Sequence, residues 1–292
     1  MNRINFWDMK VSELCFGCDS VGTKLSKELS YELLDKYIEN GGNFLDTARI
    51  YCDGNSEGFI REYLNSRNLK NNIYVATKIG HPPLDDLHKS RINISDLEDD
   101  LNNSLKELGT DCIDMLYLHR DDENQPAGEI LEMMNEFISA GKIRHFAVSN
   151  WKGSRIKEAN DYAKAHSLSP IVASSVMYNI AKHNGHPDDT LVIMDEKELE
   201  FYKESKLPVF PYSSQARGFF EKYVSGAEIP AGTAKQYLND ENIALANELK
   251  KQSEITGKTL SKLSLEKLVS DSDFPVFPVI GVTRMEQLNQ IL

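Results

Sequence analysis

Short apolar runs that suit β-strands alternate with helical patterns along nearly the whole 292-residue chain. Several of these runs are apolar almost throughout, as strands buried on both faces are. The eight expected strands are residues 13–17, 43–46, 73–79, 112–119, 143–149, 170–176, 207–212 and 274–281. The expected helices are residues 26–42, 55–67, 95–109, 126–141, 154–166, 194–205, 239–257 and 259–270, with a last helix beginning near Arg284.

This alternation is typical of a (β/α)8 barrel or of a large doubly wound parallel sheet. No stretch is rich enough in Pro and Gly to be a linker between domains. Barrels of about 250 residues form single domains. We therefore expect an α/β fold, a (β/α)8 TIM barrel, as one domain over residues 1–292. In its helix 95–109, Ser95 and Glu98 stand at capping-box spacing, and Gly109 marks the end.

The composition limits the classes of partner. The chain is 40% hydrophobic and 27% charged, which is ordinary for a globular protein. Its 45 acidic and 33 basic residues give a net charge of −12, which disfavours binding to nucleic acid. The first residues lack the apolar core of a signal peptide, and no stretch approaches the roughly 18 apolar residues of a membrane span. We expect a cytoplasmic protein without a membrane partner, and the oligomeric state stays open.

Two features resemble metal or redox motifs only weakly. Cys15 and Cys18 form a CxxC pair, but it lies in a strand pattern, and no second pair of ligands accompanies it. His183, His186 and Pro187 lie in a long connection, which we expect to be a loop over the barrel mouth. We therefore expect no metal site.

Polar side chains stand at the ends of nearly all the expected strands. In a barrel of this kind, chemistry gathers at the carboxyl ends of the strands. The residues at or just beyond these ends are Asp46, Lys78, His119, Ser149, Asn150, Ser175 and Tyr212. Each has an ordinary structural explanation when taken alone, such as a helix cap or a satisfied core histidine. Together they favour a site, because polar groups buried behind apolar strands require one another or a ligand.

We interpret four of these side chains as one catalytic set. Asp46 and Lys78 would form an ion pair at the barrel mouth, with the ammonium beside the phenol of Tyr51. A free tyrosine has a pKa of about 10, and a neighbouring cation lowers it. We therefore expect a lowered pKa for Tyr51, which would make it a usable proton donor. His119 would hold the oxygen of the substrate.

Six segments in order resemble the signature segments of the aldo-keto reductases, from about Leu14 to the end of the chain. They are FLDTARIYCDGNSE, VATKIG, MLYLHRDD, AVSNW, PYSSQARGFF and VIGVTRMEQL. The resemblance implies a carbonyl reductase on a (β/α)8 barrel that uses NADPH, or sometimes NADH, and usually needs no metal. It also implies that Tyr51 is the general acid, that Asp46 and Lys78 tune its pKa, and that His119 orients the carbonyl of an aldehyde or ketone.

The same resemblance assigns the cofactor site. Ser149 and Asn150 match residues that bind the nicotinamide carboxamide, and Tyr212 matches the aromatic residue that stacks on the ring. The remaining matches are Gly17 and Cys18 at the ribose, Ser213, Ser214, Gln215, Arg217 and Gly218 around the pyrophosphate, and Gly281, Thr283, Arg284 and Gln287 at the adenosine phosphate. A guanidinium at 284 suits the 2′-phosphate of NADP, so we expect NADP, with NAD as the alternative.

The sequence departs from the family pattern in three places. Ser175 stands where many members have Gln, and its shorter side chain leaves one contact to the carboxamide open. Ile291 stands where an Asn often binds the adenine, so Gln290 is expected to serve there. The sequence ends at Leu292, where relatives often continue into a loop that shapes the substrate site, and we expect a more open pocket.

Other functions remain compatible with parts of the pattern. Lys78 could act as the Schiff-base nucleophile of a barrel lyase or aldolase, but it would have to lose its proton, which Asp46 opposes. A metal-dependent hydrolase would need a His-x-His motif on the first strand, which reads ELCFG. A cofactor-binding regulatory protein with slow turnover would keep the same residues.

Overall fold

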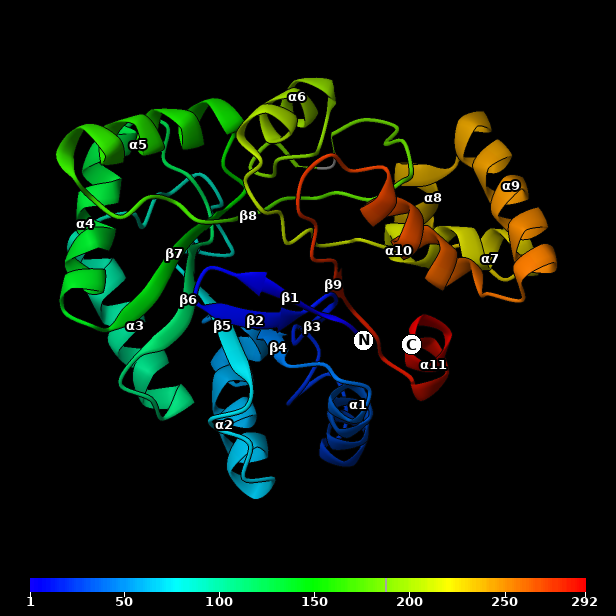
Figure 1. Cartoon of the computed structure of the whole chain (residues 1–292), viewed down its shortest axis with the longest axis horizontal. Coiled ribbons are helices and arrows are strands. Elements are labelled where there is room, and N and C mark those ends of the chain that lie inside the picture. Colours follow the sequence, from blue (N-terminus) through cyan, green and yellow to red (C-terminus); the bar gives the residue numbers. More distant parts are fainter. Residues whose placement is uncertain (187) are drawn as a thin grey trace.

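The computed structural model describes residues 1–186 and 188–292 and shows parallel strands surrounded by helices (Figure 1). The strands are β1 (Arg3–Phe6), β2 (Met9–Ser12), β3 (Cys15–Gly17), β4 (Phe44–Asp46), β5 (Tyr74–Ile79), β6 (Ile113–Leu118), β7 (Ile143–Ser149), β8 (Ser174–Ser175) and β9 (Val279–Ile280). The helices are α1 (Lys27–Glu39), α2 (Ser56–Ser66), α3 (Ile94–Leu108), α4 (Ala127–Ser139), α5 (Gly153–His166), α6 (Glu196–Ser205), α7 (Phe219–Ser225), α8 (Ala231–Tyr237), α9 (Asp240–Thr256), α10 (Leu260–Ser270) and α11 (Met285–Ile291). Two short 3-10 helices are η1 (Tyr51–Gly54) and η2 (Ala216–Gly218).

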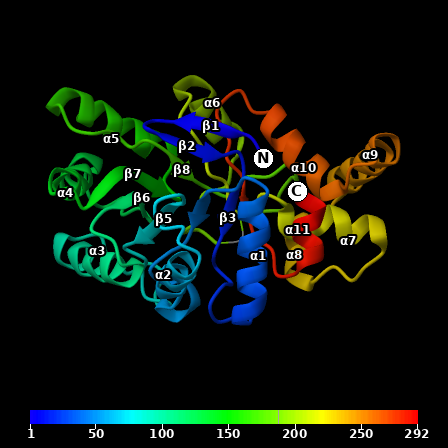
Figure 2. The same cartoon turned by 60° about the horizontal axis from the view of Figure 1, so that its bottom comes forward.

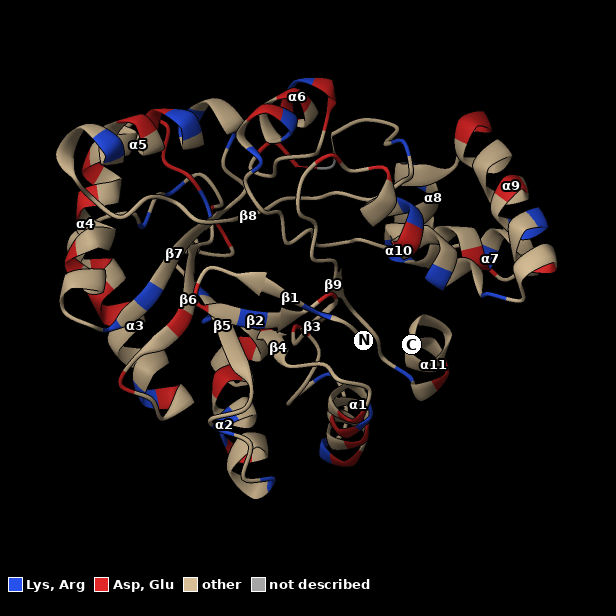
Figure 3. Ribbon diagram, viewed as in Figure 1, with Lys and Arg blue, Asp and Glu red and all other residues tan. Residues whose placement is uncertain are grey.

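Seven strands form one curled parallel sheet, in the order β8-β7-β6-β5-β4-β3-β9. Helices α1 to α5 lie along its outer side (Figure 2). The largest apolar cluster fills the space between strands and helices, with Leu33, Leu116 and Phe146 fully buried in it. Charged residues lie mainly on the helices and loops, while the strands carry few (Figure 3). The sheet therefore places the carboxyl ends of its strands together at one edge.

The strand expected at 207–212 does not form a regular strand. Its Val209 instead makes isolated parallel bridges to Ser174 on one side and to Val276 on the other. Residues 170–176 and 274–281 likewise keep only the two-residue strands β8 and β9. Prolines recur in residues 207–212 and 274–281, and a proline has no N–H to continue a hydrogen-bonded ladder.

The first residues of the chain form an antiparallel hairpin that the sequence patterns do not predict. Strands β1 and β2 pair with Phe6 opposite Met9. The Phe6 ring packs edge-on against Phe210 and Phe277, at centroid distances of 5.4 and 5.9 Å. This second apolar cluster includes Phe44, the first residue of β4. The hairpin thus covers the amino ends of the strands, opposite the end at which the polar residues gather.

The sequence patterns located most helices but not all of their ends. The cap of α3 is Asn93, whose side chain accepts a hydrogen bond from the Asp96 N–H, so the expected start at Ser95 is wrong. Asparagine two residues earlier satisfies the same free N–H groups. Gly109 ends this helix with a φ of 65°, as expected. Helices α7 and α8, of seven residues each, lack a long apolar period and were not predicted.

The structure also places the CxxC pair and part of the long connection. All four cysteines are free, and Cys15, Cys18 and Cys52 are buried. In the long connection, the His183 ring lies beside the Tyr237 ring. Pro187 of the same connection lies outside the described residues. Within residues 1–186 and 188–292, no group of three His, Cys, Asp or Glu side chains is arranged to hold a metal ion. In the same residues, none of the helices has the length and apolarity that crossing a membrane requires.

Candidate active site

The ends of neighbouring strands bring the expected catalytic residues together. Asp46 is the last residue of β4 and lies in register with Gly17 on β3 and Ala76 on β5. Lys78 stands two residues further along β5. The backbone N–H of His119, just after β6, donates to the Ile79 carbonyl at 2.9 Å. Parallel register therefore sets these side chains at one edge.

Lys78 and Asp46 form a buried ion pair. The Nζ–Oδ1 distance is 2.5 Å, and the two side chains are 4% and 5% exposed. The ammonium also donates to the Thr47 carbonyl at 2.9 Å. Burial by itself lowers the pKa of Lys78, but the charge of Asp46 and the neighbouring Tyr51 outweigh it, and the pKa is raised. Lys78 is therefore a fixed cation.

Tyr51 lies against this cation. The Lys78 Nζ is 4.8 Å from the centroid of the phenol ring. The next two residues, Cys52 and Asp53, have left-handed φ values of 53° and 54° and turn the chain at η1. The Cys52 thiol donates to the Val21 carbonyl at 3.1 Å, which ties the turn to the segment after β3. The turn thereby fixes the position of the tyrosine.

A buried polar network holds the same turn from the other side. The Thr47 hydroxyl lies 2.8 Å from the Ser56 hydroxyl, which donates to the Cys18 carbonyl at 2.9 Å. The Thr77 hydroxyl donates to the Glu57 carboxylate at 2.6 Å. The SE pair in the FLDTARIYCDGNSE segment thus serves to hold the loop between β4 and α2 against β5.

The pKa of Tyr51 differs from the sequence expectation. Burial raises the pKa of the phenol above its ordinary value, and the charge of Lys78 offsets only part of that rise. The prediction of a lowered pKa is therefore wrong, because the spacing of charges along the chain does not reveal how far the phenol is removed from water. Tyr51 is a protonated phenol at neutral pH.

His119 lies beside the phenol as a neutral imidazole. The ring centroids of His119 and Tyr51 are 5.8 Å apart, and His81 packs edge-on against His119 at 4.7 Å. Burial, followed by the charge of Lys78, lowers the pKa of His119 well below its ordinary value. Its Nδ1 is buried with no hydrogen-bond partner among the described residues. The ring is thus neutral with one unpaired nitrogen, although His119 does not line either cavity described below.

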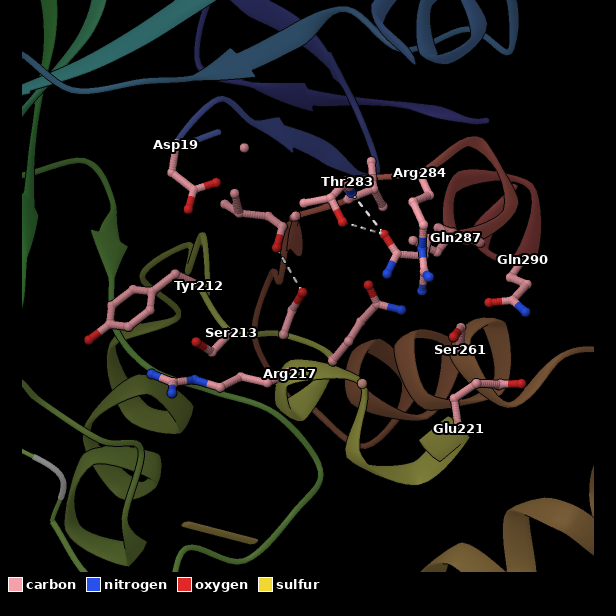
Figure 4. Close-up of a pocket in the computed structure, with 18 of the residues that line it drawn as sticks. Asp19, Tyr212, Ser213, Arg217, Glu221, Ser261, Thr283, Arg284, Gln287 and Gln290 are labelled. Atoms are coloured by element: carbon pink, nitrogen blue, oxygen red, sulfur yellow. Dashed lines mark hydrogen bonds between the residues drawn. The ribbon is translucent and has the colours of Figure 1, made fainter. Parts of the chain in front are cut away.

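A long cavity of about 760 Å³ begins at Tyr51 and Asp46. Most of the expected cofactor residues line it: Gly17, Asp46, Tyr212, Ser213, Ser214, Gln215, Arg217, Gly218, Gly281, Thr283, Arg284, Gln287 and Gln290. Tyr212 lies at one end and Gln290 at the other (Figure 4). The loop at 213–218 curves through backbone with positive φ, including 55° at Arg217 and 72° at Gly218.

Four expected cofactor residues do not line this cavity. Cys18, Ser149 and Ser175 are buried, and Asn150 borders a second, smaller cavity. The Tyr212 hydroxyl donates to the Asn150 side-chain oxygen at 2.7 Å. Tyr212 therefore stands between the cavity and the expected carboxamide contacts in this conformation.

The cavity has polar lining residues that the sequence patterns did not indicate: Asp19, Glu221, Lys222, Ser225, Ser261 and Glu286. Burial, and then the charge of Arg284, lowers the pKa of Lys222, so two cations lie near each other at this end. The signal for Glu221 and Lys222 was their place directly after the PYSSQARGFF segment. Ser261 gave no signal, because only the packing of α10 beside α7 brings it there.

Comparison with known sequences agrees with this geometry. A sequence profile of the Aldo/keto reductase family matches residues 13–292. The chain belongs to the aldo/keto reductase family. Norsolorinic acid reductase B of Dothistroma septosporum is 25% identical over 297 residues, which cover 96% of this chain and 73% of that protein. A probable aryl-alcohol dehydrogenase of Saccharomyces cerevisiae is 26% identical over 288 residues, covering 91% of this chain and 82% of that protein. An aryl-alcohol dehydrogenase [NADP(+)] of Phanerodontia chrysosporium is 25% identical over 310 residues, covering 96% of this chain and 77% of that protein.

Aldo/keto reductases use nicotinamide cofactors, and the cavity suits such a ligand. Its volume of about 760 Å³ is within the range of about 300–1,000 Å³ usual for cofactor sites. The Oδ2 atom of Asp46 is buried and has no partner among the described residues, so it can accept a hydrogen bond from a ligand hydroxyl. Lys222 and Arg284 at the other end suit a phosphate.

The ion pair leads to a stability prediction. Replacing Lys78 by Met should lower the free energy of unfolding by about 3–5 kcal/mol, because the Asp46 carboxylate stays buried without its cation. Lys258→Met is the matched control, since Lys258 pairs with Glu266 where both side chains are over 40% exposed. That change should cost at most about 1 kcal/mol. Urea denaturation measures both, and similar small losses would contradict the structural role of the buried pair.

Proposed function

We propose that this protein is a reductase of aldehydes or ketones that uses NADPH, with NADH as the alternative. The observation that carries the proposal is the buried Lys78–Asp46 pair beneath Tyr51, at one end of a cavity of about 760 Å³. The names of the relatives favour aromatic carbonyl compounds as first substrates to test. We also propose one domain with a closed (β/α)8 barrel, which the bridges of Val209 to both neighbouring segments support.

The proposed chemistry uses Asp46 and Lys78 at the strand ends and Tyr51 in η1. The larger cavity would hold a reduced nicotinamide, which would provide the hydride for the carbonyl carbon. Tyr51 donates its phenolic proton to the carbonyl oxygen as negative charge develops there. Lys78 then stabilises the phenolate that remains, because its Nζ lies 4.8 Å from the ring centroid. Asp46 keeps Lys78 charged and in place throughout.

His119 orients the substrate in this proposal. A neutral imidazole can donate one hydrogen bond to a carbonyl oxygen without competing with Lys78 as a second cation. Donors fixed in advance stabilise the charge that develops on the oxygen. The ring is held by the strand end at Leu118 and by the edge of His81. We infer that it points the oxygen at the Tyr51 hydroxyl.

The cofactor residues have proposed roles along the cavity. Tyr212 would pack on the nicotinamide ring, and Arg217 in the 213–218 loop would face the pyrophosphate. Asn150 and Ser149 would bind the carboxamide, and the side-chain oxygen of Asn150 now accepts a 2.7 Å hydrogen bond from the Tyr212 hydroxyl. Arg284 would hold the 2′-phosphate, with Lys222 as a second cation that the sequence did not indicate.

The Schiff-base alternative is disfavoured. A lysine nucleophile must lose its proton, but Asp46 and Tyr51 raise the pKa of Lys78. A regulatory protein that binds the cofactor and turns over slowly would keep this geometry. Turnover and cofactor release therefore have to be measured separately.

Tyr51→Phe tests the general acid. Loss of the proton donor should lower kcat at least about a hundredfold, since general acid catalysis contributes roughly 10²–10⁴-fold. The dissociation constant for NADPH should stay close to that of the wild type, because the ring remains. NADPH oxidation with aromatic aldehydes, ketones and quinones gives the first quantity, and NADPH fluorescence gives the second. Unchanged turnover in this variant would refute the assignment of Tyr51.

The pKa shifts predict a flat pH profile for reduction. His119 has a pKa well below its ordinary value and Tyr51 one above it, so neither changes protonation state between about pH 7 and pH 9. Reductive kcat/KM should fall only as the pH rises through the raised pKa of Tyr51, when the proton donor is lost. Oxidation of the alcohol, which needs the phenolate, should increase over the same interval. A reductive inflection near neutral pH that His119→Gln abolishes would contradict this assignment.

Arg284→Gln tests cofactor choice. The variant should bind NADPH on the order of 10- to 100-fold more weakly, because a charged hydrogen bond to the 2′-phosphate is lost. NADH lacks that phosphate, so its binding should hardly change and serves as the internal control. Fluorescence titration measures both. Equal losses for the two cofactors would show that Arg284 acts on the shape of the site instead.

A further inference from the structure

We infer that Arg120 binds a carboxylate of the substrate, so that the enzyme acts on small aldehydes or ketones that carry a carboxylate group. The inference rests on the proposed function and narrows its substrate class. Arg120 directly follows His119, the residue expected to orient the carbonyl.

Arg120 is a half-buried cation with no carboxylate within ion-pair distance among the described residues. Most other arginines outside the larger cavity pair with an acid: Arg49 with Glu57, Arg67 with Asp35, Arg91 with Asp100, Arg144 with Asp114 and Arg155 with Asp121. The Nε of Arg120 is buried and has no hydrogen-bond partner in the described residues. Buried charge and buried donors normally have partners, so this arrangement suits an anionic ligand.

The guanidinium presents a defined edge to such a ligand. Its Nη1 donates to the His119 carbonyl at 2.8 Å, which fixes the orientation of the group. Nε and Nη2 form the other edge, which makes no hydrogen bond to a described residue, although Nε is covered by neighbouring atoms. Two parallel N–H groups match the two oxygens of a carboxylate, which is the usual bidentate geometry.

Arg120 lies close to the proposed reaction site. It borders the second cavity, of about 230 Å³, together with Asn150. The Asn150 amide nitrogen donates to the same His119 carbonyl at 3.5 Å, and its oxygen accepts the Tyr212 hydroxyl. Tyr212 in turn lines the larger cavity. The charge of Arg120 also contributes to the lowered pKa of His119, so a carbonyl held at that imidazole would lie near the guanidinium.

The other charged groups around the second cavity already have partners. Asp121 pairs with Arg155 at 3.0 Å, Glu123 with Lys152 at 2.7 Å, Asp189 with His88 at 3.7 Å, and nearby Asp188 accepts from Thr190 at 2.7 Å. Asp122 accepts from the amide groups of Asn124 and Gln125. These acids would repel a dianion such as a phosphate monoester more strongly than a monoanion. Among the anions that a guanidinium binds, the surroundings therefore disfavour a dianion more than a monoanion such as a carboxylate.

The test compares two aldehydes that differ only in charge, 4-carboxybenzaldehyde and its neutral methyl ester. Wild-type kcat/KM with NADPH should favour the acid on the order of 10- to 100-fold, the range for hydrogen bonds between charged groups. Arg120→Gln should bring the ratio of acid to ester close to one, and Arg120→Lys should keep part of the preference. Arg61→Gln is the matched control: Arg61 also lacks an acid partner among the described residues and also donates to a backbone carbonyl, that of Lys106. It should leave both rates unchanged.

A second readout does not depend on turnover. Calorimetric titration with benzoate in the presence of NADP⁺ should show binding to the wild type that Arg120→Gln weakens by a similar factor. A wild-type ratio near one, or an equal loss on both aldehydes in Arg120→Gln, would overturn the inference. If neither aldehyde is reduced, the proposed reductase is contradicted, and the benzoate titration still decides whether Arg120 binds a carboxylate.

Discussion

The buried ion pair between Lys78 and Asp46 determines the character of the proposed site. Two charges with side chains only 4% and 5% exposed are tolerated because they lie 2.5 Å apart and the ammonium also reaches the Thr47 carbonyl. The pair keeps a buried cation at the carboxyl ends of the strands, against the ring of Tyr51. Without it, burial alone would raise the pKa of the phenol further, and the phenolate left after proton transfer would have no countercharge.

The rest of the site is arranged around this pair by the parallel sheet. Register places Gly17, Asp46 and Ala76 side by side, and the loop after β4 is held to β5 by Thr47 and Arg49 N–H bonds to the Ala76 and Lys78 carbonyls. The hairpin at the amino ends of the strands packs Phe6 into the opposite end of the structure. One end is therefore apolar and filled, and the other carries the polar groups and both cavities.

The sequence predicted which side chains meet at the strand ends, but not how burial shifts the pKa of Tyr51. Asp46, Lys78, Tyr51 and His119 could be chosen because polar residues at the ends of apolar strands meet in a parallel sheet. The direction of the Tyr51 pKa shift was predicted wrongly, because the competition between burial and a cation depends on three-dimensional packing. Arg120 stood in the MLYLHRDD segment, yet its lack of an acid partner is a matter of which side chains the folded loops bring near.

The order of strands and helices, the residues at the strand ends and the family were determined by the sequence itself, since local periodicity and short segments carry that information. Tertiary structure alone decided that the strand pairing near Val209 is reduced to isolated bridges, and that the first residues form a hairpin. It also placed Tyr212 against Asn150 and brought Lys222 and Ser261 to the far end of the cavity. These features depend on contacts between residues far apart in the chain. Such contacts produce no periodic pattern in the sequence of either segment, so they are determined only when the sheet curls and its loops pack together.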